Sequence, residues 1–188
     1  GSTPVPPGQY VTDDFPVLSM GPTPEVELAR WRFTLSNGPK PVMSWTWSEF
    51  ERLPRTTWRG DIHCVTKWTK FDTQWEGVGI DDLFSVAGIT SWPAYALALS
   101  YDGYDTNVPV ADLTGGRAMI ATRYDGTPLP AEHGGPARLL VPHLYFWKSA
   151  KWLKGLRFTE KNEAGFWELR GYHIYGDPWR EQRYTNDP

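Results

Sequence analysis

Ile62-His63-Cys64-Val65-Thr66-Lys67-Trp68 contains the only cysteine of this 188-residue chain. The residues from Thr56 to Cys64 read as a strand, with Cys64 at its exit. Successive side chains of a strand point to opposite faces, so His63 and Cys64 form a poor nucleophilic pair unless the strand ends there. The stretch therefore predicts a strand that delivers one thiol to a loop.

A lone cysteine limits the chemistry of the chain. It excludes an internal disulfide and any cysteine-cluster site for zinc or an iron–sulfur centre. A buried structural thiol is the commonest fate of a free cysteine. The alternatives are a nucleophile or a ligand for a soft metal, because thiolate is a soft donor. The spacing around Cys64 leaves these three interpretations open.

Length and composition predict one ordinary globular domain over residues 1–188, with 40% hydrophobic and 22% charged residues. The net charge of −3, with mixed signs, argues against a nucleic-acid-binding face. Residues 1–8 are Pro-rich and expected to be flexible, and Gly1-Ser2 is typical of a cloning scar. No apolar run is long enough to span a membrane. A cytoplasmic location is expected, with a processed exported form as the alternative.

The 18 Gly and 17 Pro residues are spread along the whole chain, which predicts many short elements in an α+β, strand-dominated fold. Thr46 and Glu49 have capping-box spacing for a short helix, and Asp81 could cap a second one. Residues 147–154 have helical spacing. The expected strands cover residues 31–36, 42–45, 56–64, 95–100, 117–123, 137–141 and 156–160.

Two basic stretches suggest an anion site. They contain four cationic or potentially cationic groups, together with Gly residues and a hydroxyl, a combination that suits a phosphate. A solvated basic face is the alternative interpretation of any such run. The stretches are His133-Gly134-Gly135-Pro136-Ala137-Arg138 and Trp147-Lys148-Ser149-Ala150-Lys151-Trp152.

The chain also has 11 Trp residues, an unusually high number. An aromatic-rich binding module would gather them on one face to stack on a glycan or peptide. Their spread from Trp31 to Trp179 instead favours large core residues. The four His residues show no zinc-hydrolase spacing.

These stretches together resemble the sulfite oxidase family of molybdopterin enzymes, in particular its short, single-domain bacterial members. The resemblance covers the chain from about Pro7 onward and implies the mixed, strand-dominated fold of that family. It is carried by residues 62–68, 133–142 and 148–153, and by the tail Gly165-Phe166-Trp167-Glu168 … Gly176-Asp177-Pro178-Trp179.

The resemblance implies that Cys64 ligates molybdenum, together with the dithiolene of a single molybdopterin. One thiolate and a dithiolene form a soft, sulfur-rich ligand set. The N-terminal loop of relatives carries Arg-Asn-His where this chain has Leu18-Ser19-Met20, so contacts from that loop differ. The implied cofactor-binding residues are Ser19, Met20, Cys64, Ser100, His133, Arg138, Ser149, Ala150 and Lys151.

The substrate side departs from the sulfite oxidases. Relatives that oxidise sulfite follow the cysteine with Ala-Gly-Asn-Arg-Arg, whereas Val65-Thr66-Lys67-Trp68-Thr69 follows it here. Lys67 is a point charge that does not replace bidentate guanidinium recognition of an oxyanion. Lys67 and Trp68 are the substrate-side candidates, and a sulfoxide-like substrate is favoured over sulfite.

The resemblance thus implies an oxidoreductase that transfers two electrons or an oxygen atom at a small substrate, with a separate protein as electron donor or acceptor. Two alternatives remain: the aromatic-rich binding module, and a family member that no longer carries the cofactor.

Overall fold

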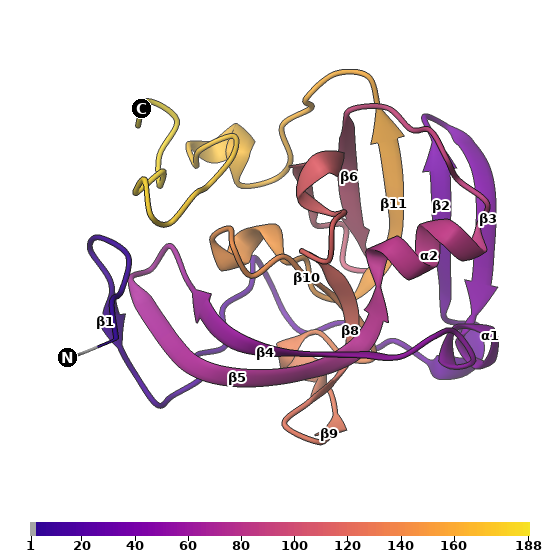
Figure 1. Cartoon of the computed structure of the whole chain (residues 1–188), viewed down its shortest axis with the longest axis horizontal. Helices are drawn as coiled ribbons and strands as arrows, with labels where there is room; N and C mark the ends of the chain where they lie inside the picture. The colour runs from indigo at the N-terminus through magenta and orange to yellow at the C-terminus, as the bar shows by residue number, and fades with distance from the viewer. Residues whose placement is uncertain (1–2) are drawn as a thin grey trace.

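A computed structural model describes residues 3–188, which fold into two mixed sheets with few helices (Figure 1). The α+β, strand-dominated expectation is confirmed. Gly1-Ser2, the suggested cloning scar, lies outside the described residues. The flexibility expected of residues 1–8 stays a prediction, although Pro6 is buried and the Pro7 carbonyl accepts a hydrogen bond from Arg183.

The first sheet carries the cysteine hairpin. Its strands run in the order β1 (Tyr10–Val11), β5 (Trp68–Gly79), β8 (Met119–Tyr124) and β10 (Arg138–Leu140), with β4 (Thr56–His63) paired to β5 and β9 (Thr127–Pro128) to β8. β4 and β5 are antiparallel, with His63 opposite Thr69, whereas β1 is parallel to β5. The expected strand ending at Cys64 is therefore present, and β5 is its long, unanticipated partner.

The second sheet packs against the first. Its order is β3 (Lys40–Thr46), β2 (Arg32–Asn37), β11 (Leu153–Thr159), β6 (Tyr95–Ser100) and β7 (Asp105–Pro109). β11 pairs in parallel with β2, and the other pairings are antiparallel. The α-helices are α1 (Trp47–Glu51) and α2 (Ile80–Val86), and the 3₁₀ turns are η1 (Leu28–Arg30), η2 (Val110–Asp112), η3 (Ala131–His133), η4 (Phe146–Lys148) and η5 (Glu168–Arg170).

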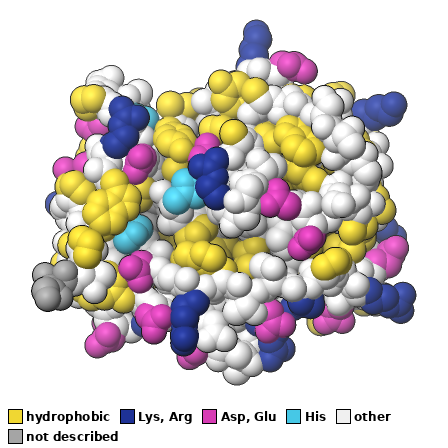
Figure 2. Space-filling view, viewed as in Figure 1, with side chains coloured by type: hydrophobic (Ala, Val, Ile, Leu, Met, Phe, Trp, Pro, Cys, Tyr) yellow, Lys and Arg dark blue, Asp and Glu magenta, His cyan; other side chains and the backbone are white. Residues whose placement is uncertain are grey.

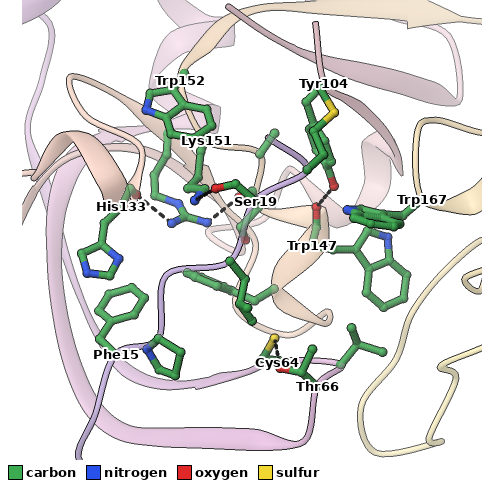
Figure 3. Close-up of a pocket in the computed structure, with 18 of the residues that line it drawn as sticks. Phe15, Ser19, Cys64, Thr66, Tyr104, His133, Trp147, Lys151, Trp152 and Trp167 are labelled. Carbon is green, nitrogen blue, oxygen red and sulfur yellow. Dashed lines mark hydrogen bonds between the residues drawn. The ribbon is translucent and has the colours of Figure 1, made fainter. Parts of the chain in front are cut away.

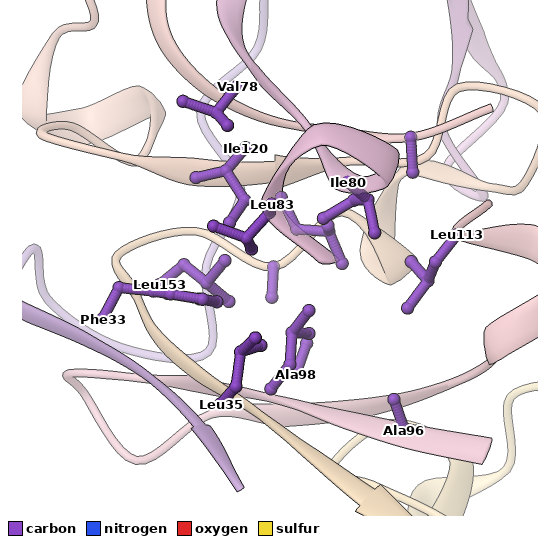
Figure 4. Packing of buried hydrophobic residues seen from close by; sticks show 14 of the residues in the cluster. Phe33, Leu35, Val78, Ile80, Leu83, Ala96, Ala98, Leu113, Ile120 and Leu153 are labelled. Atoms are coloured by element: carbon purple, nitrogen blue, oxygen red, sulfur yellow. The ribbon is translucent and has the colours of Figure 1, made fainter. Parts of the chain in front are cut away.

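The main core lies between the sheets and beneath α2 (Figure 4). Leu35 of β2, Ile120 of β8 and Leu83 of α2 are all fully buried there. At about 1.5–3 kcal/mol per buried large apolar side chain, this contact fixes the relative position of the two sheets. The sheets in turn set where the loops at their ends can meet.

Five of the 11 tryptophans are buried and five more are partly buried, in line with the large core residues that the sequence suggested. Trp31, Trp75 and Trp152 are among the largest fully buried side chains, whereas Trp179 is 52% exposed. Among the described residues no other Trp is classed as exposed. The exposed cluster of Trp residues that an aromatic-rich binding module requires is therefore not found in residues 3–188.

Two local expectations were wrong. Residues 147–154 do not form a helix: η4 ends at Lys148 and β11 begins at Leu153, because the backbone N–H groups of Trp152 and Leu153 bond instead to Gly134 and Ala137. Asp81 does not cap α2, whose N-cap is Gly79. The Asp81 carboxylate instead accepts hydrogen bonds from the backbone of the loop at residues 115–116.

The surface charges bear on nucleic-acid binding, and the helix lengths bear on membrane insertion. On the visible face, Lys and Arg side chains are interspersed with Asp and Glu (Figure 2), so no single-sign patch dominates it. Within residues 3–188, every helix is too short or too polar to cross a bilayer.

Candidate functional site

A cavity of about 310 Å³ lies where loops from both sheets converge (Figure 3). Its walls come from segments that are far apart in the sequence. They include the N-terminal loop between Phe15 and Met20, the turn after β4, Asp102 and Tyr104, His133 and Arg138, residues 146–152 apart from Lys148, and the aromatic residues Trp167 and Tyr172.

Cys64 reaches this cavity because β4 ends one residue before it. Its backbone N–H donates to the Trp68 carbonyl at 2.9 Å, and its carbonyl accepts from the Lys67 N–H at 3.0 Å, which closes a tight turn. Lys67 adopts a left-handed φ of 87° to complete that turn. The Cys64 side chain is 7% exposed, and its sulfur lies 3.0 Å from the Thr66 hydroxyl (Figure 3).

Burial is the main influence on this thiol and raises its pKa, while the Thr66 hydroxyl and the charge of Arg183 act in the opposite direction. His63 does not serve as its base: the His63 ring contacts the Thr69 hydroxyl at 2.9 Å and is not part of the cavity wall. The structure therefore separates the two side chains, as strand alternation requires.

Arg138 is a buried cation without an acidic partner. It begins β10, is 2% exposed, and donates to the carbonyls of His133 at 2.8 Å and Ser149 at 2.6 Å. Its guanidinium lies 4.1 Å from the centre of the Phe146 ring. Burial lowers its pKa to about 9. No described carboxylate forms an ion pair with it.

Lys151 is a second such cation on the same wall. Its ammonium donates to the Ser19 hydroxyl at 2.6 Å and the Glu132 carbonyl at 3.1 Å, and it pairs with no carboxylate among the described residues. Burial, followed by the charge of Arg138, lowers its pKa to about 8. Asp102 of the same wall and Glu132 offset part of the charge of Lys151, but neither cation forms an ion pair with a described carboxylate, which makes this end of the cavity attractive to an anion.

The cavity brings together most of the residues singled out from the sequence. His133 stacks on Phe15 with ring centres 3.8 Å apart, and the Ser149 hydroxyl accepts a hydrogen bond of 2.8 Å from the Val141 N–H. Trp68 is buried, and its indole N–H has no hydrogen-bond partner among the described residues. The candidates on the wall are Ser19, Met20, Cys64, Trp68, His133, Arg138, Ser149, Ala150 and Lys151.

Two candidates are not on the wall. Ser100 is buried in β6 with a hydroxyl that lacks a partner among the described residues, and Lys67 is exposed in the turn. Lys148, within the second basic stretch, also points elsewhere. Its ammonium lies 3.1 Å from the Glu168 carboxylate, and both side chains are almost fully buried.

Sequence reasoning missed an aromatic wall on the other side of Cys64. The Tyr104 hydroxyl donates to the Trp147 carbonyl at 2.6 Å, and the Trp147 ring lies 4.9 Å from that of Tyr172 (Figure 3 labels Tyr104, Trp147 and Trp167). The aromatic content of the C-terminal tail was the available signal. Without regular periodicity, it did not predict which rings meet.

Comparisons with known proteins agree with this site. The sequence profile described as "oxidoreductase molybdopterin binding domain" matches residues 20–167. An uncharacterized oxidoreductase, YuiH of Bacillus subtilis (strain 168), is 42% identical over 97% of this chain and 93% of its own length. A putative protein-methionine-sulfoxide reductase subunit, YedZ1 of Azospira oryzae, is 28% identical over 81% of this chain and 58% of its own length.

The fold has a solved counterpart. The sulfane dehydrogenase SoxCD from Paracoccus pantotrophus superposes with a TM-score of 0.65 at 23% identity, over 74% of this chain and 40% of that one. At this identity the likeness concerns the fold alone.

The residues present fit a molybdopterin. The cofactor offers a phosphate and a sulfur-bound metal. The cavity offers the soft donor Cys64 together with Arg138 and Lys151, which form no ion pair among the described residues. The unpaired Trp68 N–H adds a hydrogen-bond donor in the same wall. The chain therefore belongs to the oxidoreductase molybdopterin-binding family, in the sulfite oxidase group that its motifs indicated, and its cofactor is molybdenum-molybdopterin.

Proposed function

We propose that this oxidoreductase transfers two electrons or an oxygen atom at a small sulfoxide-like substrate, with the Cys64 thiolate as the protein ligand to molybdenum. One observation carries the proposal. The only cysteine of the chain lines the same cavity as two cations that form no ion pair with a described carboxylate. A soft thiolate and an anion site in one cavity match the two ends of the cofactor.

The cofactor supplies the redox chemistry, and the chain supplies its binding and orientation. Arg138 and Lys151 would hold the phosphate by charge-assisted hydrogen bonds. Burial lowers the pKa values of both groups, and a bound anion would raise them again, which would keep both groups protonated. The Thr66 hydroxyl, 3.0 Å from the sulfur of Cys64, orients a lone pair of the thiolate.

The preference for a neutral sulfoxide over sulfite rests on the charges around Cys64. Its neighbours on the wall are Val65, Thr66 and Trp68, none of which is cationic, and Lys67 is not on the wall. Arg183 is near, but its guanidinium donates to the Val65 and Pro7 carbonyls. Arg138 lies within electrostatic range of Cys64, but it is the guanidinium assigned to the cofactor phosphate. Among the described residues, an oxyanion would therefore find no further guanidinium beside Cys64 that is free of other contacts. The name of the Azospira oryzae relative supports a sulfoxide.

Electrons pass to or from a separate protein in this proposal. The Azospira oryzae relative is named as a subunit, which supports such a partner. The cytoplasmic location suggested by the sequence stays a prediction.

The test uses protein produced in a molybdenum-competent host. Sulfoxides, N-oxides, sulfite and nitrate are offered with an artificial electron carrier. We expect bound molybdenum and pterin, turnover of sulfoxides in excess of sulfite, and loss of turnover and of the thiolate-to-molybdenum visible absorption in Cys64→Ser. Unchanged turnover and absorption in Cys64→Ser would exclude Cys64 as an essential ligand, and faster turnover of sulfite would overturn the substrate class.

A further inference from the structure

The turn that carries Cys64 is bound from outside by both ends of the chain. Beyond the two hydrogen bonds within the turn, Tyr10 N–H donates to the Lys67 carbonyl at 2.8 Å. Gln9 and Arg183 donate to three more carbonyls of the same segment. β1 and the C-terminal segment accordingly flank the end of the β4–β5 hairpin (Figure 1).

Arg183 is the centre of this arrangement. It is 4% exposed, and one nitrogen of its guanidinium donates to the Val65 carbonyl at 2.6 Å. The other donates to the Gln9 side-chain carbonyl at 2.6 Å and the Pro7 carbonyl at 3.1 Å. The guanidinium also lies 5.1 Å from the centre of the Tyr145 ring. Its planar geometry thus joins three segments that are distant in sequence.

Gln9 connects Arg183 to the backbone of Cys64 by hydrogen bonds. With its carbonyl oxygen held by Arg183, its amide nitrogen donates to the Cys64 carbonyl at 3.1 Å and the Trp68 carbonyl at 2.9 Å. These are the residues at the two ends of the turn. The hydrogen bonds therefore fix the backbone of Cys64 and, through it, the direction in which the sulfur points.

The positive charge of Arg183 is only partly neutralised. The partner of its Nε is the Glu181 carboxylate at 3.3 Å, which is 45% exposed and therefore screened by solvent. The remaining positive charge lies beside the residue that follows Cys64.

We propose that Arg183, acting through Gln9, is a positioning residue that holds the Cys64 turn with its sulfur directed into the cavity. The proposal rests on the proposed function, because it assumes that Cys64 ligates the metal. It goes beyond the family assignment, since Gln9 and Arg183 both lie outside the matched residues 20–167.

The test compares Arg183→Met with Arg180→Met, an exposed arginine of the same segment. Protein is produced in a molybdenum-competent host, and molybdenum per chain is measured during dialysis. Loss of an outer-shell partner typically weakens metal binding about 10- to 100-fold, so Arg183→Met is expected to release molybdenum that much more readily. Arg180→Met is expected to behave like the parent protein.

A second readout does not depend on the metal. In cofactor-free protein, hydrogen exchange at the Cys64 and Lys67 amides reports opening of the turn. We expect faster exchange there in Arg183→Met, with the amides of β6 unchanged. Arg183→Lys keeps the charge but cannot bond Val65 and Gln9 with the same geometry, so it should restore only part of the molybdenum binding.

Gln9→Met provides the same test if Arg183→Met fails to fold. It removes the amide that bonds Cys64 and Trp68, and it should reproduce both effects. Unchanged molybdenum binding and turn exchange in Arg183→Met or Gln9→Met would overturn the positioning role while Cys64→Ser still loses turnover and the thiolate-to-molybdenum absorption. Unchanged turnover and absorption in Cys64→Ser would instead overturn the proposed function itself, so the two failures are distinguishable.

Discussion

Lys151 and Ser19, which are 132 positions apart in the sequence, are joined by a hydrogen bond of 2.6 Å from Nζ to Oγ. With the stacking of Phe15 on His133, this bond fastens the N-terminal loop over the cavity. The loop departs from the family at Leu18-Ser19-Met20, yet Ser19 and Met20 still line the wall. The cationic end of the cavity is therefore closed by residues that the local sequence alone would not pair with it.

Replacing Lys151 should weaken retention of the cofactor. Lys151→Met removes a charge-assisted hydrogen bond worth about 1.5–3 kcal/mol, which corresponds to roughly 10- to 100-fold weaker binding. Pterin released during dialysis, followed by fluorescence, measures the effect. Lys154→Met, at an exposed position of β11, is the matched control and should retain the cofactor. Equal release from the two variants would contradict a phosphate-binding role for Lys151.

Stability of the cofactor-free protein should rise with pH between about 8 and 10. The pKa of Lys151 is lowered from 10.5 to about 8 in the folded protein. The unfolded chain therefore binds more protons across that window, and raising the pH favours the folded state. Urea denaturation at pH 7.5–10 in steps of about half a pH unit measures the slope. The slope of the free energy of unfolding against pH should be smaller in Lys151→Met. An unchanged slope would show that other groups cause the pH dependence.

Lys67→Gly should stabilise the turn after β4. Lys67 has a φ of 87°, a left-handed conformation that costs a non-glycine residue roughly 1–2 kcal/mol. Glycine avoids this cost, but its more flexible unfolded state offsets part of the gain in stability. A net gain of about 0.5–1 kcal/mol in the free energy of unfolding is expected. Lys70→Gly, within β5, should be destabilising in the same urea titration. A raised KM in Lys67→Gly, against our expectation, would restore Lys67 as a substrate-side residue.

Glu168→Gln should be strongly destabilising. Glu168 lies 3.1 Å from the fully buried Lys148 ammonium and accepts a further hydrogen bond of 2.5 Å from the Trp147 indole. Removing one member of a buried ion pair leaves an uncompensated charge, at a cost of about 3–5 kcal/mol. The double variant Lys148→Met/Glu168→Gln should recover much of that loss in urea denaturation. A loss below about 1 kcal/mol in the single variant would show that Lys148 finds another partner or loses its proton.

Part of this architecture could be predicted because its signals are local. The capping box of Thr46 and Glu49 is present as expected, since it depends on residues three positions apart. The strand that ends at Cys64 is present too. The long partner strand β5 was not predicted. Buried and exposed side chains do not alternate regularly along β5, and no Gly or Pro residue marks its start in the turn after Cys64.

The sequence by itself determined the strand-dominated class, the exit position of Cys64 and the family to which its motifs belong. Only the tertiary structure decided which basic residues share the cavity. Lys148 and Lys151 are three positions apart, yet Lys148 pairs with Glu168 in the interior whereas Lys151 faces the cavity. Lys148 ends a 3₁₀ turn, and irregular backbone continues from it through Lys151. The path of this backbone depends on hydrogen bonds to distant Gly134 and Ala137. Local spacing cannot encode such contacts, because they exist only once the two sheets have packed.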